Sequence, residues 1–377
     1  MLKHGTLFAA IAAAAILAAA CGGDDSHETQ PATPGVTATA SEPTVSATVT
    51  ALALGTEAPV DEAKDATEVE RQAQLRGAER TQAFIEGNYP LNNYDIRTVE
   101  LHEIFPVLPR DGIRAIFEPN FDSIAAANDW LAYDEPVISV EFNGTARAYP
   151  LKILTWHEIV NDNVGGEPLV VTYCPLCNTA IVFKRTVDGE ERIFGVSGAL
   201  RRNDLIMYDR QTETLWQQIT GTAIVGEPAG AQLEFVAAQI VSWQDFSHSF
   251  PDATVLNRDT GSFASYDKNP YPYYDQLGSE TFFPIEDYDK TTLDGKERVL
   301  TVNLGNDPIA FPFSVLSEAV VLEAESAGQH IVAFWQPGAS SPLDEAFIIA
   351  GRNVGSAGAF IPTADGQQLT FESRDTA

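Results

Sequence analysis

The chain has 377 residues, of which 53 are acidic and 23 are Lys or Arg, so its formal net charge is −30 at pH 7. This excess of negative charge argues against nucleic acid and anionic lipid surfaces as electrostatic partners, because both repel an acidic protein. The hydrophobic content of 44% is ordinary for a globular protein. The roughly 300 residues beyond the N-terminal region can bury a large core and form one large or two ordinary domains.

The first 21 residues predict an export signal. Lys3 and His4 precede an apolar run that is shorter than the roughly 20 residues that span a bilayer, and three alanines lead to Cys21. Small residues directly before a cysteine are typical of the lipobox of bacterial lipoproteins. We therefore expect lipidation at Cys21 and an extracytoplasmic protein anchored to the cell membrane. The alternative is an ordinary secretory signal cleaved nearby, which predicts the same side of the membrane.

Two segments separate this signal from the main domain. Residues 22–58 are rich in Thr, Ala and Pro and lack periodicity, so they predict a disordered tether. Residues 59–95 contain a stretch rich in Ala, Glu, Arg and Gln, which predicts a helical lead-in.

The main domain is expected over residues 96–291. Two β-prone runs flank Asn143-Gly144, which predicts a hairpin. Residues 151–161 have helical periodicity and are followed by Gly165-Gly166, which we expect to end the helix. Further strands are predicted at 169–173, 180–183, 192–196, 205–208 and 214–217. Many short strands and few helices predict a β-rich α+β fold with mostly antiparallel strands.

The C-terminal part repeats part of this pattern. Residues 135–151 resemble residues 297–313, which predicts one full copy of a unit followed by a divergent partial copy at 292–377. Ala319 stands near the place that His157 has in the first copy. The second copy is therefore expected to keep the scaffold without the site.

Soft, polarisable side chains occur in one neighbourhood of the mature chain. Cys174 and Cys177 are the only cysteines after residue 21, and Met207 is the only methionine after the initiator. A Cys-x-x-Cys sequence on a tight turn between two strands can direct both sulfurs at one ion. This pair is therefore the first candidate for chemistry.

Two thiolates supply half of a tetrahedral ligand set. The missing ligands would come from His157, from Met207, or from a carboxylate such as Glu158 or Asp162, and Asn161 is placed to orient the imidazole. A set of two cysteines, a histidine and a methionine suits copper, since thiolate and thioether prefer the soft Cu(I) ion. We therefore predict a metal site, copper before zinc, that binds the ion or relays electrons.

Two other interpretations stay open. The cysteines could form a thiol–disulfide redox pair, or one could act as a nucleophile with His157 as its base, and the chain would then be an enzyme. In an oxidising envelope they could equally form a structural disulfide in a non-catalytic binding module. The sequence has no Gly-rich phosphate loop, so no nucleotide cofactor is expected, and it does not name a protein or small-molecule partner.

Several long motifs occur in a distinctive order. They include WHEIVND at 156–162 and YCPLCNTA at 173–180, followed by LIMYDR at 205–210 and LWQQ at 215–218. This order closely resembles the bacterial domain-of-unknown-function family 3179 over about residues 100 to 290, with a weaker trace beyond. The resemblance implies no established activity, so the functional expectations rest on the residues themselves.

Overall fold

The structure is a computed structural model, and it describes residues 68–284, 293–305, 307–364 and 367–371. The predicted export signal, Cys21, the 22–58 tether and the boundary after residue 291 lie outside the described residues. No described helix is both long and apolar enough to span a membrane. The described residues up to 296 form a larger unit together with 337–356, while the described residues of 297–336 and from 357 on form a smaller unit.

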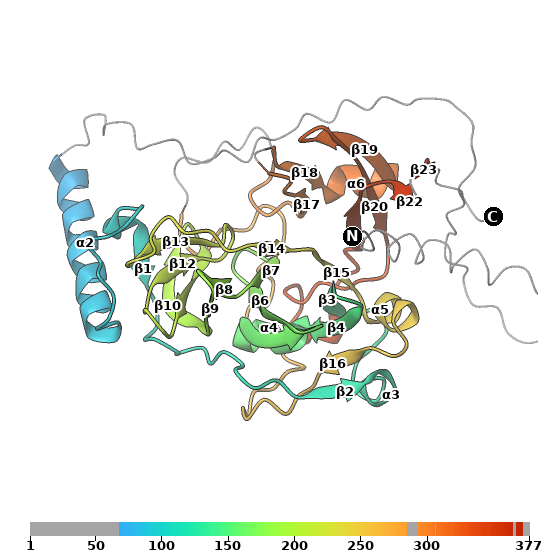
Figure 1. The fold of residues 1–377 in the computed structure, drawn as a ribbon, viewed down its shortest axis with the longest axis horizontal. Coiled ribbons are helices and arrows are strands. Elements are labelled where there is room, and N and C mark those ends of the chain that lie inside the picture. The colour runs from blue at the N-terminus through green and yellow to red at the C-terminus, as the bar shows by residue number, and fades with distance from the viewer. Residues whose placement is uncertain (1–67, 285–292, 306, 365–366, 372–377) are drawn as a thin grey trace, which may run out of the picture. The chain divides into compact units, whose positions relative to one another are not determined.

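The larger unit is built on β-sheets whose strands pair almost entirely antiparallel (Figure 1). One five-stranded sheet has the order β1 (Ile104–Pro106), β10 (Phe194–Arg201), β11 (Asp204–Asp209), β12 (Leu215–Gln217), β13 (Thr222–Val225). The other has the order β15 (Ala238–Ser242), β3 (Pro136–Phe142), β4 (Thr145–Pro150), β16 (Thr254–Leu256), β2 (Phe121–Ser123). A four-stranded sheet has the order β14 (Phe235–Val236), β7 (Thr179–Lys184), β6 (Glu167–Cys174), β5 (Ile159–Val164), and β8 (Thr186–Val187) pairs with β9 (Glu190–Glu191). The parallel exception is β16 with β4, so the β-rich, mostly antiparallel α+β prediction is confirmed.

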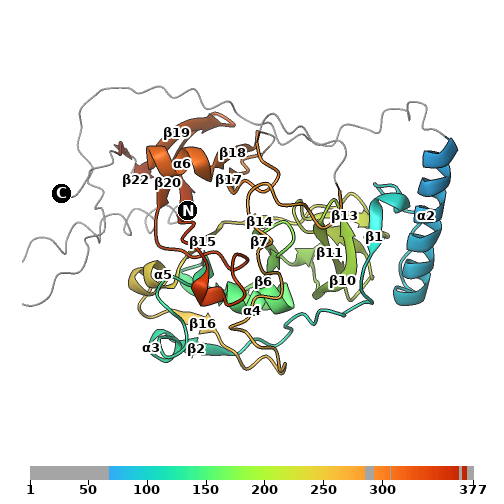
Figure 2. The ribbon, with the colours of Figure 1, turned by 180° about the vertical axis from the view of Figure 1, so that it is seen from behind.

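Helices of the larger unit are mostly short. They are α2 (Glu68–Asn88), η1 (Leu101–Glu103), α3 (Ile124–Ala127), α4 (Leu151–His157), α5 (Trp243–Ser249) and η2 (Ile348–Ala350). The long helix α2 lies along η1 and β1 at the edge of the first five-stranded sheet (Figures 1 and 2).

The smaller unit begins with a hairpin, continues with a helix and ends with further strands. Its elements are β17 (Val299–Val302), β18 (Ile309–Pro312), α6 (Phe313–Ala319), β19 (Val321–Ser326), β20 (Gln329–Gln336), β21 (Ser356–Phe360), β22 (Thr363–Ala364) and β23 (Gln367–Gln368). Strands β17 and β18 pair antiparallel, β19, β20 and β21 form a sheet in that order, and β22 pairs with β23. Its own apolar cluster is centred on Phe311 and Leu316, both fully buried.

The predicted hairpin at Asn143-Gly144 is present between β3 and β4. Asn143 has φ 48° and Gly144 has φ 73°, and the flanking residues Phe142 and Thr145 are paired. Positive φ at both central residues is the geometry that lets a two-residue turn follow the twist of its strands. Asn and Gly adopt it at little cost, which is why this element was predictable.

The predicted helix over 151–161 is wrong in its last four residues. Helix α4 ends at His157, and Glu158 adopts φ 58°, after which residues 159–164 form β5. The β-branched pair Ile159-Val160 favours a strand, and pairing with β6 satisfies its backbone. Gly165-Gly166 therefore makes the turn between β5 and β6 instead of ending a helix.

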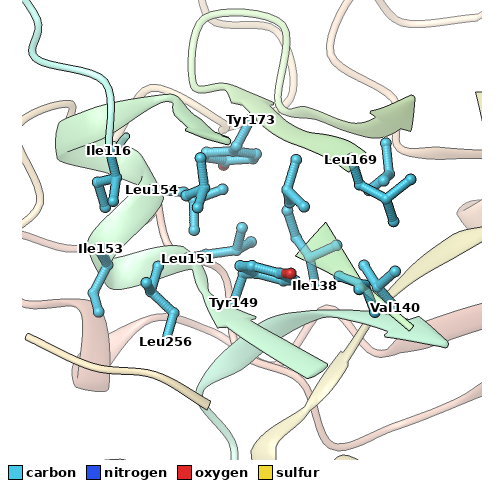
Figure 3. Close-up of a cluster of buried hydrophobic side chains, with 14 of the residues drawn as sticks. Ile116, Ile138, Val140, Tyr149, Leu151, Ile153, Leu154, Leu169, Tyr173 and Leu256 are labelled. Carbon is cyan, nitrogen blue, oxygen red and sulfur yellow. The ribbon is translucent and has the colours of Figure 1, made fainter. Parts of the chain in front are cut away.

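Apolar packing fixes the ends of α4 and β6. In the cluster of Figure 3, Ile153 and Leu154 of α4 pack with Tyr149 of β4 and Tyr173 of β6, all fully buried. Burying a side chain of this size contributes about 1.5–3 kcal/mol. This packing holds Glu158, which directly follows α4, and Cys174, which is the last residue of β6.

Candidate metal centre

The two cysteines lie where the sequence predicts, on the turn between β6 and β7. Cys174 is the last residue of β6 and is buried, while Cys177 lies in the turn and is partly exposed. Both thiols are free in the structure. The turn closes with Asn178 at φ 48°, whose backbone N–H donates to the oxygen of Pro175 at 3.3 Å.

A carboxylate from another sheet meets this turn. Asp204 is the first residue of β11, directly after a tight turn in which Arg202 and Asn203 have φ 52° and 65°. The ligand atoms of Cys174, Cys177 and Asp204 all lie within 4.8 Å of one another. The Cys177 thiol donates to Asp204 Oδ1 at 3.2 Å. Two sulfurs and one oxygen therefore converge on a single point.

The second carboxylate oxygen of Asp204 anchors the side chain. Oδ2 accepts a hydrogen bond from the Ile219 backbone N–H at 3.0 Å and a short one from Gln217 Nε2. These donors leave Oδ1 directed toward the thiols. Such support from neighbouring groups is what fixes a ligand's orientation in metal sites.

Glu158 is a further acid beside this group. It follows α4 directly, its side chain is only 6% exposed, and no described residue donates a hydrogen bond to its carboxyl. Burial, and secondarily the charge of Asp204, raise the pKa of Glu158 to about 8. Since a charge–charge effect requires proximity, the two carboxyls share one electrostatic environment.

Burial disfavours the charged forms of Asp204 and Cys177 as well as that of Glu158. Burial raises the pKa of Asp204 to about 6 and raises that of Cys177 well above its usual value. The groups that shift these values most include no lysine or arginine. Because the thiolate is the reactive form of cysteine, a raised pKa does not favour Cys177 as a nucleophile.

His157 lies close by in the sequence but has other partners. Nδ1 bonds to the backbone oxygen of Arg114 at 2.6 Å, and Nε2 bonds to the Tyr266 hydroxyl at 2.7 Å. A carbonyl oxygen only accepts, so Nδ1 carries the proton and Nε2 accepts from the tyrosine. Burial lowers the pKa of His157, which favours this neutral form. Both ring nitrogens are engaged, and neither belongs to the group formed by the cysteines and Asp204.

Asn161, expected to orient the His157 ring, instead bonds the backbone of Phe194 on β10 through both its amide nitrogen and its oxygen. It lies on β5 because α4 ends early, so the helical spacing that suggested the contact does not exist. Asp162, named as a possible ligand, pairs with Arg147 and accepts from the Tyr149 hydroxyl at 2.6 Å.

Met207 is fully buried on β11. It packs in an apolar cluster with Leu205 and Trp216 that also contains Cys174. An apolar cluster is the ordinary place for a methionine, whose flexible chain fills irregular gaps. The prediction that Met207 is a ligand stays a prediction.

Sequence reasoning did not select Asp204. The residues Arg201 to Asp204 were recognisable as a turn between β-prone runs, but nothing local indicates that this turn meets the cysteines. The available signal was the turn itself, since a two-residue turn at Arg202-Asn203 places the next residue at the start of a strand.

The family comparison agrees with the motifs. The model of the family described as "Protein of unknown function (DUF3179)" matches residues 110–376. No curated protein and no solved structure matches the chain. The match covers most of the chain, and the chain therefore belongs to the DUF3179 family.

Proposed function

We propose that this protein binds one transition-metal ion through Cys174, Cys177 and Asp204. The observation that carries the proposal is the convergence of two thiols and a carboxylate within 4.8 Å. A buried cluster of acids that has no basic partner among the described residues is unfavourable by itself, because each charge loses its hydration. A bound cation neutralises the negative charges of these groups. It also lowers their pKa values, so that they bind the ion in their deprotonated forms.

The donor set favours zinc before copper. With Asp204 present, an oxygen joins the two sulfurs, whereas the set preferred from the sequence adds His157 and Met207 to them. Zinc accepts cysteine and aspartate together in a tetrahedral arrangement, whereas Cu(I) prefers soft thiolate and thioether ligands. Zinc has no redox chemistry, so the proposed role is binding of the ion and not electron relay.

The smaller unit supports the predicted internal repeat and serves as a comparison for the site. Its hairpin pair Val299 with Pro312 corresponds to Val137 with Pro150. The same offset in residue number relates the next strand pair of each unit, in which Val321 faces Phe334 and Ile159 faces Thr172. The alignment therefore needs no insertion or deletion between the two hairpins. Each hairpin is followed by a seven-residue helix that begins after a proline and then by an antiparallel strand pair.

The backbone of the two units agrees at the residue that ends the helix. Glu158 has φ 58° and Val320 has φ 64°, and each donates its N–H to a helix carbonyl at 2.7 Å. On this alignment Val320 takes the place of Glu158, and Gln336 that of Cys174. The positive φ is thus a property of the turn and does not require an acid. The alignment also implies that the same fold forms without Glu158 and Cys174.

The test is metal content and zinc affinity of the purified chain. We expect one ion per chain, and roughly a hundredfold weaker binding after Cys174→Ser, Cys177→Ser or Asp204→Asn. Asp162→Asn is the matched control, because it changes a buried carboxyl that already has Arg147 as a partner. A wild-type chain that binds no metal in excess zinc would refute the proposal.

We further propose that the protein is exported and anchored through a lipid on Cys21. The short apolar run and the small residues before that cysteine support this. The test is incorporation of labelled fatty acid in a bacterial host. Cys21→Ser should abolish the label and release the chain from membranes, and an unchanged membrane fraction would contradict the anchor.

A further inference from the structure

A pocket opens beside the C-terminal end of α4. Its volume is ≈ 400 Å³, and residues 155–157 form one wall. Small-molecule sites in proteins have volumes of roughly 300–1,000 Å³. The pocket is therefore large enough for a compact organic molecule, and it is separate from the point where the thiols converge.

The charge of the pocket differs from that of the whole protein. None of the residues that line it is Asp or Glu, although the chain carries 53 of these, and Arg114 is among them. The Arg114 guanidinium makes a single hydrogen bond, to the Gly261 oxygen at 3.3 Å, and no ion pair with a described residue. Its charge also contributes to the lowered pKa of His157. Arg114 is exposed to solvent at the pocket, and a cation without an acidic partner there favours an anionic over a cationic ligand.

The remaining walls are largely apolar. Ile113 and Pro270 contribute aliphatic surface, and Trp156 and Tyr271 contribute aromatic surface. Trp156 is fixed by its indole N–H, which donates to the Lys268 oxygen at 3.0 Å. These surfaces suit an apolar body attached to a charged group.

Tyr271 connects the pocket with the acid cluster. Burial raises its pKa, and the charges of Glu158 and Cys174 raise it further, so its phenol lies near both. It also lines the pocket, and no described residue hydrogen-bonds its hydroxyl. Tyr271 is therefore a lining residue of the pocket that also senses the charges of two acids of the centre.

We propose that this pocket binds a small carboxylic acid with an aromatic or aliphatic body. The carboxylate pairs with the Arg114 guanidinium, the Tyr271 hydroxyl donates to it, and the body packs against Trp156. The binding site is complete without a metal ion, so the proposal does not rest on the proposed function.

The experiment uses benzoate and its neutral analogue benzamide as probes. Each is titrated into the purified chain while NMR follows the indole N–H signals, with Trp156 assigned through Trp156→Phe. We expect saturable shifts of the Trp156 signal and about tenfold tighter binding of benzoate, the effect of one charge-assisted pair at a part-exposed site. Arg114→Gln should remove this preference, and Arg114→Lys should keep most of it.

The control is Arg97→Gln, which removes an exposed arginine outside the pocket whose guanidinium donates to the Tyr94 oxygen. Equal affinity for both probes, or an equal loss in this control, overturns the proposal. So does the absence of saturable benzoate binding up to about 10 mM.

Metal dependence separates the two proposals. Benzoate should bind the metal-free chain and the Cys174→Ser/Cys177→Ser variant as it binds the wild type. Binding that appears only with zinc would mean that the probe coordinates the ion, and it overturns the pocket. If the chain does not bind zinc but still binds benzoate more tightly than benzamide, the pocket proposal is supported and the metal-site proposal is refuted.

Discussion

Replacing Glu158 by valine should stabilise the metal-free protein. The side chain is buried, no described residue hydrogen-bonds it, and its pKa is about 8 against an ordinary value of 4.5. At pH 7 the folded chain must retain a proton that the unfolded chain has lost. At about 1.4 kcal/mol per pH unit between 4.5 and 7, this costs about 3 kcal/mol. Valine removes that cost, and Val320 occupies the same backbone conformation in the smaller unit.

The pH dependence follows from the direction of the shift. Because the folded-state pKa of Glu158 is raised, the folded chain binds more protons than the unfolded chain between about pH 4.5 and pH 8. Wild-type stability therefore falls as pH rises through this window, and Glu158→Val lacks this loss. The gain should be near zero at pH 4.5 and reach about 3 kcal/mol at pH 7.

The assay is urea unfolding after chelator treatment, followed by tryptophan fluorescence at several pH values. A gain of about 3 kcal/mol corresponds to a rise in the urea midpoint of roughly 1–3 M. Glu158→Gln is the control, since it removes the charge but leaves a buried polar group, and it should gain less. A destabilised Glu158→Val, or a gain that is the same at pH 5 and pH 8, would refute the reasoning.

Two further predictions concern the scaffold and the ligand set. Gly198→Ala should destabilise the chain by more than about 3 kcal/mol, because Gly198 has φ 83° and its Cβ would lie 2.2 Å from the Leu108 oxygen. Gly144→Ala has a similar φ but open space, so urea unfolding should show a loss of only about 1 kcal/mol. His157→Gln and Met207→Leu should each keep zinc affinity within a few fold in competition with a chelator, since neither residue is in the proposed set. A loss of about a hundredfold in either would restore the set first predicted from the sequence.

Local sequence signals predicted local structure well and the site only in part. The hairpin at Asn143-Gly144 and the cysteine turn follow from turn chemistry and β-propensity, which act over a few residues. The helix at 151–161 was predicted too long, because helical periodicity fitted residues 159–161, which form part of β5. Asp204 escaped prediction because its approach to Cys177 depends on how two sheets meet, and no sequence spacing encodes that contact.

The proposed repeat relates the connection between β6 and β7 to the connection between β20 and β21, and these two connections differ in length and in what they contact. In the first copy, four residues join β6 to β7, and they include Cys177. In the second copy, residues 337–355 join β20 to β21, and 337–356 belong to the larger unit. There Arg352 pairs with Asp275 at 3.0 Å, and the Ser340 N–H donates to the Asp134 oxygen at 2.7 Å.

Under the proposed repeat and the proposed metal site, this connection carries a ligand in the first copy and structural contacts in the second. Loops tolerate such exchange because their length costs little entropy, whereas the strands that flank them keep their register. If the cysteines were needed to hold the turn, the copy without them should have lost the strand pair that precedes it. It keeps that pair from Val321 to Phe334 in the register of the first copy. This favours a functional over a structural reason for the buried thiols and acids, and it makes loss of metal without loss of folding the expected outcome of removing them.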